Sequence, residues 1–314
     1  MLMRKEEFFF DSRDRESRIH AVKWIPDESP SCIVQIVHGM SEYVERYEEF
    51  AEYLTAKNIL VVGEDHLGHG QSIGNHPPGY FCKKDAATVV VRDVHRLKKM
   101  VQEEYPQIPY IIFGHSMGSM MVRNYLTKYG TGIDGAVICA TTMPNRLKLC
   151  VSGFLTRVLA LLQGEEHESH FLNYLGFGNC GRRIKNPVST FDWLSTDSEI
   201  VKKYNEDPLC GFCFTVNGFR TLKELGTRLY DKKALLAIPK ELPVLFLYGT
   251  EDPIGAYGTE VEKTYRSYLA LGMKHVKIKK YEGDRHELLN EKDRDIVMAD
   301  VYSWICEHIL DKRG

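Results

Sequence analysis

Short apolar runs alternate with amphipathic stretches along the first half of the chain. Residues 31–37 are almost wholly apolar and rich in β-branched side chains, which is typical of a strand covered on both faces of its sheet. Residues 43–57 carry aromatic and aliphatic side chains at helical spacing and predict an amphipathic helix. Further strands and helices are predicted at 7–11, 17–25, 59–63, 86–105, 110–113, 117–129 and 135–139, the first two as a hairpin. This order predicts a mostly parallel sheet with helices on both sides, a three-layer α/β architecture.

The alternation stops after Pro144 and resumes at residue 244. Residues 147–162 predict one more amphipathic helix, but 164–209 mix histidine, aromatic, glycine and proline residues without a regular pattern. Strands are predicted again at 244–248 and 276–280, followed by a closing helix at 293–309. An insertion of about 75 residues between two strands is too long for a bare loop, so we expect a cap subdomain. The predicted core is 1–144 with 217–314, and the predicted cap is 145–216.

Composition and charge exclude several classes of protein. The 314 residues are 43% hydrophobic and 27% charged, with a formal net charge of −2 and no block of lysine and arginine. We therefore expect a packed fold and no nucleic-acid partner. No apolar run approaches the ~18 residues of a membrane-spanning helix, so any membrane contact is expected to be peripheral.

The N-terminus and the cysteines point to a cytoplasmic protein. The first 18 residues contain no apolar core of signal-peptide length, and the eight cysteines are scattered as reduced thiols would be. Cys210 and Cys213 have the spacing of a redox pair. They follow the turn-like residues 205–208 deep in the chain instead of an early strand, which favours idle thiols.

The pentapeptide Gly114-His-Ser116-Met-Gly118 lies between a predicted strand and a predicted helix. In that context G-x-S-x-G is a nucleophile elbow, in which a tight turn exposes the serine in a strained conformation. Glycines are needed because side chains at 114 and 118 would collide with the neighbouring strand and helix. The alternative is that Ser116 only caps a helix.

A serine nucleophile needs a base within hydrogen-bond reach and a third group that fixes the tautomer of that base. Asp252 follows the strand 244–248, with Glu251 beside it as the fallback acid, and His286 follows the last strand. Each could instead be an ordinary loop residue. All three candidates stand at the carboxyl ends of strands, where open α/β sheets bind ligands, so we predict that Ser116, Asp252 and His286 form one site.

Ester chemistry also needs hydrogen-bond donors for the oxyanion that develops in the transition state. The backbone N–H of Met117, at the start of a helix, is one candidate. Met40 supplies the other, in the turn His38-Gly39-Met40 that follows the strand 31–37. The alternative is that this turn merely ends the strand.

Two other patterns are weaker. The glycine-rich residues 68–74 resemble a nucleotide-binding loop, but His76-Pro77-Pro78 prevents the helix that would hold a phosphate. Asp65, His66, His69 and His76 lack the register of a metal site, so we expect no metal and no cofactor.

With these motifs the chain resembles the monoglyceride lipase and lysophospholipase-like branch of the α/β-hydrolases, from about residue 8 to 309. The most specific part is Asp65-His-Leu-Gly-His-Gly-Gln-Ser72, and the order serine, acid, histidine is also that of α/β-hydrolases. The resemblance implies an α/β-hydrolase fold with a helical cap between the sixth and seventh strands. It also implies a triad of Ser116, Asp252 and His286, with oxyanion donors at Met40 and Met117.

The resemblance covers enzymes that act on monoacylglycerols, lysophospholipids and simple carboxylic esters. Our leading hypothesis is a serine ester hydrolase that cleaves lipid-like monoesters through an acyl-enzyme, with a small-molecule ester as its partner. A short-acyl or aryl carboxylesterase or a thioesterase is the enzyme alternative. A catalytically idle hydrolase fold that serves as a ligand receptor is the alternative from another class.

Overall fold

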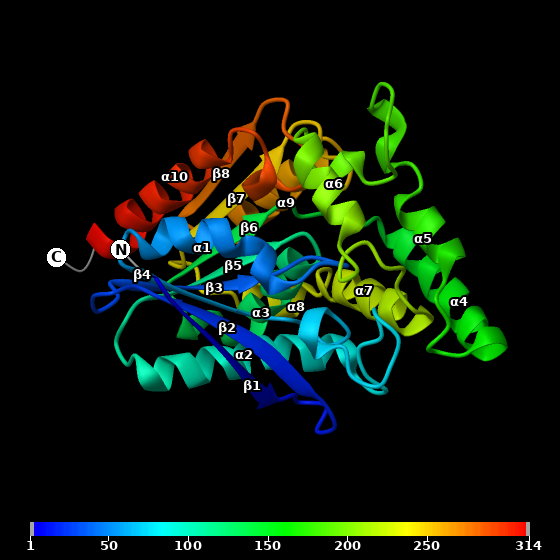
Figure 1. Cartoon of the computed structure of the whole chain (residues 1–314), viewed down its shortest axis with the longest axis horizontal. Coiled ribbons are helices and arrows are strands. Elements are labelled where there is room, and N and C mark those ends of the chain that lie inside the picture. The colour runs from blue at the N-terminus through cyan, green and yellow to red at the C-terminus, as the bar shows by residue number, and fades with distance from the viewer. Residues whose placement is uncertain (1–2, 312–314) are drawn as a thin grey trace.

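Eight strands form one sheet in the computed structural model, which describes residues 3–311 (Figure 1). The order across the sheet is β1-β2-β4-β3-β5-β6-β7-β8. β2 pairs antiparallel with β1 and β4, and every later pair is parallel. The strands are β1 (Arg4–Asp11), β2 (Arg18–Ile25), β3 (Cys32–Val37), β4 (Ile59–Glu64), β5 (Tyr110–His115), β6 (Gly135–Cys139), β7 (Val244–Gly249) and β8 (Val276–Tyr281). The predicted mostly parallel sheet is confirmed.

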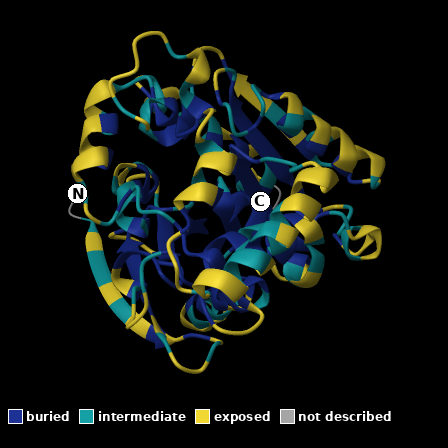
Figure 2. Ribbon diagram, turned by 90° about the vertical axis from the view of Figure 1, so that its right-hand side faces the viewer, coloured by how far each residue is buried: buried dark blue, intermediate teal, exposed yellow. Residues whose placement is uncertain are grey.

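Helices cover both faces of the sheet and bury its central strands. On one face pack α2 (Ala86–Glu104), α3 (Met117–Tyr129) and α9 (Thr259–Ala270), and on the other α1 (Glu48–Thr55) and α10 (Arg294–Ile305). Alternate residues of β3 enter the two cores, since Ile33 and Val37 join the first and Val34 and Ile36 the second. The central strands are accordingly buried, while the outer sides of the helices are exposed (Figure 2).

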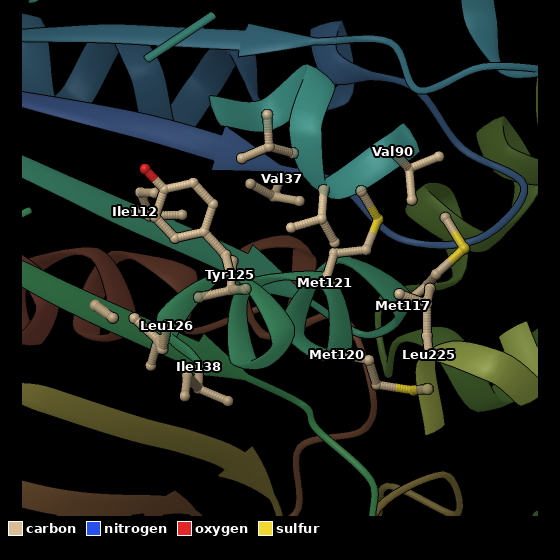
Figure 3. Packing of buried hydrophobic residues seen from close by; sticks show 14 of the residues in the cluster. Val37, Val90, Ile112, Met117, Met120, Met121, Tyr125, Leu126, Ile138 and Leu225 are labelled. Carbon is tan, nitrogen blue, oxygen red and sulfur yellow. The ribbon is translucent and has the colours of Figure 1, made fainter. Parts of the chain in front are cut away.

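α3 is held firmly in the larger core. Its methionines Met117, Met120 and Met121 lie among apolar side chains of the sheet and of the neighbouring helices (Figure 3). Each of the three is at most 3% exposed. The residue that precedes this helix, Ser116, therefore has a rigid support.

Five helices lie between β6 and β7, where the insertion was predicted. They are α4 (Arg146–Gln163), α5 (His170–Phe177), α6 (Ser198–Glu206), α7 (Val216–Arg228) and α8 (Lys232–Leu236). α7 packs on α2, α3 and α4, so it joins the outer helices to the core. The boundaries of core and cap remain predictions, and the ends of the predicted core at 1–2 and 312–314 lie outside the described residues.

The sequence pattern found most of these elements but not all. The helix predicted at 43–57 begins with a 3-10 turn, Val44–Tyr47, and α1 ends at Thr55. α5, α6, α7, α8 and α9 were not predicted. Within the described residues no helix is long and apolar enough to cross a lipid bilayer.

Candidate active site

Ser116 stands on a sharp turn between β5 and α3. Its backbone has φ 52° and ψ −117°, a conformation that strains any residue other than glycine. The turn is so tight that a Cβ at Gly118 would come within 1.9 Å of the Val37 carbonyl oxygen, and one at Gly114 within 2.6 Å of Val122 Cγ2. Both glycines are therefore required by space, as the sequence predicted.

His286 and Asp252 reach Ser116 from the loops that follow β8 and β7. His286 Nε2 lies 2.8 Å from Ser116 Oγ, and His286 Nδ1 lies 3.0 Å from Asp252 Oδ1. The Ile254 N–H also donates to Asp252 Oδ1, at 2.8 Å. His286 is 2% exposed and Asp252 is fully buried. The structure thus brings the three predicted side chains into one chain of hydrogen bonds.

Glu251, the fallback acid, does not take part in this chain. Its side chain is exposed, and its backbone N–H donates to the carbonyl of Asp284 at 2.8 Å. The geometry favours Asp252 as the partner of His286.

The turn after β3 lies directly against the serine. A Cβ placed on Gly39 would be 3.3 Å from Ser116 Cβ, so the backbone of this turn can approach a group bound to Ser116. Met117 begins α3, where the N–H groups of the first turn lack partners within the helix. Both predicted oxyanion donors, Met40 and Met117, therefore belong to segments that border Ser116.

One cap residue covers the histidine. The ring centroid of the Trp193 indole lies 5.2 Å from that of His286, and the ring of Phe177 stacks on the indole with a centroid distance of 6.4 Å. Arg285, beside His286, donates through Nη1 to the carbonyls of Asp192 and Ser195 at 2.6 and 2.8 Å. This part of the cap is consequently fixed to the loop that carries the histidine.

A buried polar cluster that no sequence motif marks lies beneath the site. Glu42 accepts hydrogen bonds from Tyr47, His115 and the Gly39 N–H, and Arg46 bridges it to Glu287. The sequence contains one sign of this cluster, because the charged residue Glu42 comes only three positions after Gly39, close to the end of an apolar strand.

Most side chains of the histidine-rich segment after β4 are buried and have a structural role. Asp65 accepts hydrogen bonds from His20 and from the backbone N–H groups of Val44 and Gln71. His66 and His69 are fully buried, and burial lowers the pKa of His66 to about 4 and that of His69 to about 3. His76 instead lies at the surface against a glutamate. No cluster of three or more metal-binding side chains occurs among residues 3–311.

Cys210 and Cys213 are both free thiols. Burial raises the pKa of both, to about 11 for Cys213, so neither forms a reactive thiolate near neutral pH.

Residues 28–293 match the family described as serine aminopeptidase, S33, which covers most of the chain. The chain belongs to this family of α/β-hydrolases. Two curated relatives resemble it over nearly their whole length. The monoacylglycerol lipase of Mycolicibacterium smegmatis is 28% identical over 290 residues, which are 91% of this chain and 92% of the relative. The monoglyceride lipase of Mus musculus is 28% identical over 91% of this chain and 86% of the relative.

Solved structures give the same grouping for this α/β-hydrolase. A thermostable carboxyl esterase from Bacillus coagulans, solved in complex with glycerol, is 32% identical with a TM-score of 0.87, and the match covers 98% of this chain and 100% of that one. The protein is thus a serine hydrolase of the monoglyceride lipase and esterase group, and the predicted family and fold are confirmed.

Proposed function

We propose that this α/β-hydrolase cleaves lipid-like carboxylic monoesters, such as monoacylglycerols or lysophospholipids, through an acyl-enzyme on Ser116. The observation that carries the proposal is the chain of hydrogen bonds from Ser116 Oγ to His286 and on to Asp252, of 2.8 and 3.0 Å. A serine hydroxyl becomes a competent nucleophile when a base accepts its proton as the new bond forms.

In the first half-reaction Ser116 Oγ attacks the ester carbonyl carbon and His286 Nε2 takes the hydroxyl proton. Asp252 holds the proton on His286 Nδ1 and stabilises the imidazolium that forms. The N–H groups of Met40 and Met117 bind the carbonyl oxygen as it becomes negative, each worth about 3 to 4 kcal/mol when well placed. His286 then gives its proton to the leaving alcohol, and the acyl group remains on Ser116.

In the second half-reaction water replaces the alcohol. His286 removes a proton from the water, the resulting oxygen attacks the acyl carbon, and Ser116 leaves with the proton that His286 returns. Fatty acid and free enzyme are the products.

Apolar surface on the cap supports a lipid-like substrate. The outer side of α4 exposes large side chains, with Leu161 87% and Leu162 76% exposed, and α5 adds Phe171 and Leu175 at 53% each. Exposed apolar patches of this kind mark sites that meet other apolar groups. The names of the two curated relatives, both lipases of monoacylglycerols, point in the same direction.

A carboxylesterase for short acyl or aryl esters is the second candidate. It is favoured by the likeness to the Bacillus coagulans carboxyl esterase at 32% identity. The catalytically idle receptor has less support, because a receptor does not need a base and an acid aligned on a serine.

Initial rates separate the two enzyme candidates. We would measure kcat/KM for p-nitrophenyl esters and for monoacylglycerols of increasing chain length, with an aminoacyl p-nitroanilide to test peptidase activity. The proposal expects turnover of the long monoesters and a fluorophosphonate adduct on Ser116. Preference for acetate would favour the second candidate, and no adduct on native protein would favour the receptor.

A further inference from the structure

The Glu42 carboxylate is the centre of a polar cluster under the turn that carries Met40. Its Oε1 accepts three hydrogen bonds, from the Gly39 N–H at 2.6 Å, the Tyr47 hydroxyl at 2.9 Å and His115 Nδ1 at 3.1 Å. Its Oε2 accepts from Arg46 Nη1 at 2.8 Å. The Glu42 side chain is only 3% exposed, so these contacts replace the water that an ionised carboxylate needs.

His115 links Glu42 to the residue that holds the base. Its Nδ1 faces the Glu42 carboxylate, and its Nε2 lies 3.1 Å from the backbone carbonyl oxygen of His286. Both neighbours are acceptors, so both ring nitrogens must carry a hydrogen and His115 is an imidazolium. Burial opposes that charge, but the hydrogen bond to Glu42 outweighs it and raises the pKa of His115.

Arg46 makes a second link between the same two segments. Its guanidinium donates two parallel hydrogen bonds to Glu287, of 2.8 and 2.7 Å, and a third to Glu42. Glu287 directly follows His286. The guanidinium also lies over the ring of Tyr204 in α6, 4.8 Å from its centroid. Because the guanidinium is planar and makes two parallel bonds, it fixes the orientation of the Glu287 carboxylate as well as its distance from Arg46.

We propose that Glu42 is a positioning residue that, through His115 and Arg46, fixes the oxyanion turn at Gly39–Met40 relative to the loop that carries His286. Glu42 itself touches neither substrate nor Ser116. It sets the distance between an oxyanion donor and the general base, which belong to segments about 245 residues apart in the chain. The inference rests on the roles proposed above for Met40 and His286.

A neutral side chain of the same shape cannot replace Glu42. One oxygen of the carboxylate serves three donors, and the charge of the carboxylate keeps His115 doubly protonated. In Glu42→Gln an amide oxygen at that position could still accept from Gly39. A neutral His115 carries one ring hydrogen, which it can donate to this amide oxygen or to the His286 carbonyl but not to both, so one of the two bonds that connect residue 42 with His286 would be lost.

The cluster predicts an unusual pH dependence for Glu42→Gln. Burial still lowers the pKa of His115 in the variant, while the hydrogen bond and charge of Glu42, the two largest effects that raised it, are gone and the smaller effects of Glu287 and the His286 carbonyl remain. The imidazolium is then lost at neutral pH and returns as the pH falls. Other titratable or charged groups around the pair are Arg46, Tyr47, Glu287, His286, His38, His66, His69, Cys139, Tyr204 and Cys210.

The test compares Glu42→Gln with Glu45→Gln, a control three residues further along the chain whose carboxylate makes a partly buried pair with Lys5, outside the cluster. We would measure kcat, KM, the rate of fluorophosphonate labelling at Ser116 and the melting temperature. The proposal expects kcat and labelling to fall about 10- to 100-fold in Glu42→Gln, as for a misplacement of about 1 Å. KM should stay within about twofold of the wild-type value. The loss of kcat relative to the wild type should become smaller as the pH is lowered from about 8 to about 5. The control should behave like the wild type.

The inference would be overturned if folded Glu42→Gln had the kcat and the pH profile of the wild type. It would also be overturned if kcat were lower than in the wild type by the same factor at every pH. If Glu42→Gln does not fold, Arg46→Lys decides, because lysine keeps the charge but cannot form the fork to Glu287. A drop in kcat with unchanged KM in Arg46→Lys supports the link, and unchanged kcat overturns it. Wild-type protein that turns over esters without labelling at Ser116 would instead overturn the proposed function.

Discussion

Asp252→Asn tests the arrangement of the acid and the base, and the structure allows two outcomes for the amide. The amide oxygen can take the place of Asp252 Oδ1, where it would keep the bonds from His286 Nδ1 and from the Ile254 N–H. The amide nitrogen then occupies the position of Oδ2, a buried atom that makes no hydrogen bond. His286 keeps its tautomer but loses the negative charge that stabilises its imidazolium.

The other orientation is worse for catalysis. The amide nitrogen would face the Ile254 N–H and would donate to His286 Nδ1, which moves the imidazole proton to Nε2, the atom 2.8 Å from Ser116 Oγ. The imidazole could then no longer accept the proton of Ser116. In serine proteases the same exchange lowers kcat about 10⁴-fold.

The magnitude follows from these two cases. Opposite charges about 4 Å apart attract by about 4 kcal/mol at an effective dielectric constant of about 20, which corresponds to about 10³ in rate. We therefore expect kcat to fall about 10³- to 10⁴-fold in Asp252→Asn. Turnover of p-nitrophenyl butyrate measures the loss, and the melting temperature shows whether the variant is folded.

Glu251→Gln is the matched control, because this neighbouring carboxylate is exposed and should leave kcat within about twofold. A folded Asp252→Asn protein with more than a tenth of wild-type activity would refute the reasoning. An inactive Glu251→Gln beside an active Asp252→Asn would identify Glu251 as the acid.

Three further predictions concern the nucleophile and the cap. Ser116→Ala should abolish turnover while the melting temperature stays near that of the wild type, and more than a trace of activity in that variant would exclude Ser116 as nucleophile. kcat/KM should rise by somewhat under fourfold for each added methylene of the acyl chain until no further methylene is buried, since each buried methylene gains ~0.8 kcal/mol. Replacing residues 147–177 by a Gly-Ser linker should remove this dependence of kcat/KM on acyl length and leave the hydrolysis of acetate esters unchanged. If kcat/KM in the intact protein is highest for acetate esters, the lipid hypothesis is contradicted. Leu161→Glu with Leu162→Glu should reduce sedimentation with phospholipid vesicles without changing hydrolysis of p-nitrophenyl acetate, and unchanged sedimentation would show that this side of α4 does not meet the lipid.

The sequence was most informative where one local pattern determines one element. β3 and β5 are apolar on both faces because both faces are covered, and the glycines around Ser116 mark a turn that leaves no room for a Cβ. Ser116, Asp252 and His286 could be grouped because the parallel strands that precede them end at one edge of the sheet.

Contacts between distant segments that no motif marks could not be predicted from the sequence. The sequence assigns no role to His115, and only the fold places it between Glu42 and the His286 carbonyl. α5 was not predicted for another reason, because its apolar residues lie on several sides of the helix and give no amphipathic pattern. α9, by contrast, carries Val261, Thr264 and Tyr268 at helical spacing and could have been predicted.

The hydrogen bonds from Arg285 to Asp192 and Ser195 restrict how the cap can open. They tie the cap segment around Trp193 to the same loop as His286, so raising that segment would drag the base away from Ser116. We therefore expect the contact between Trp193 and His286 to persist during turnover, and substrate to reach Ser116 without displacing this segment. This part of the cap would then act as a fixed support for the base.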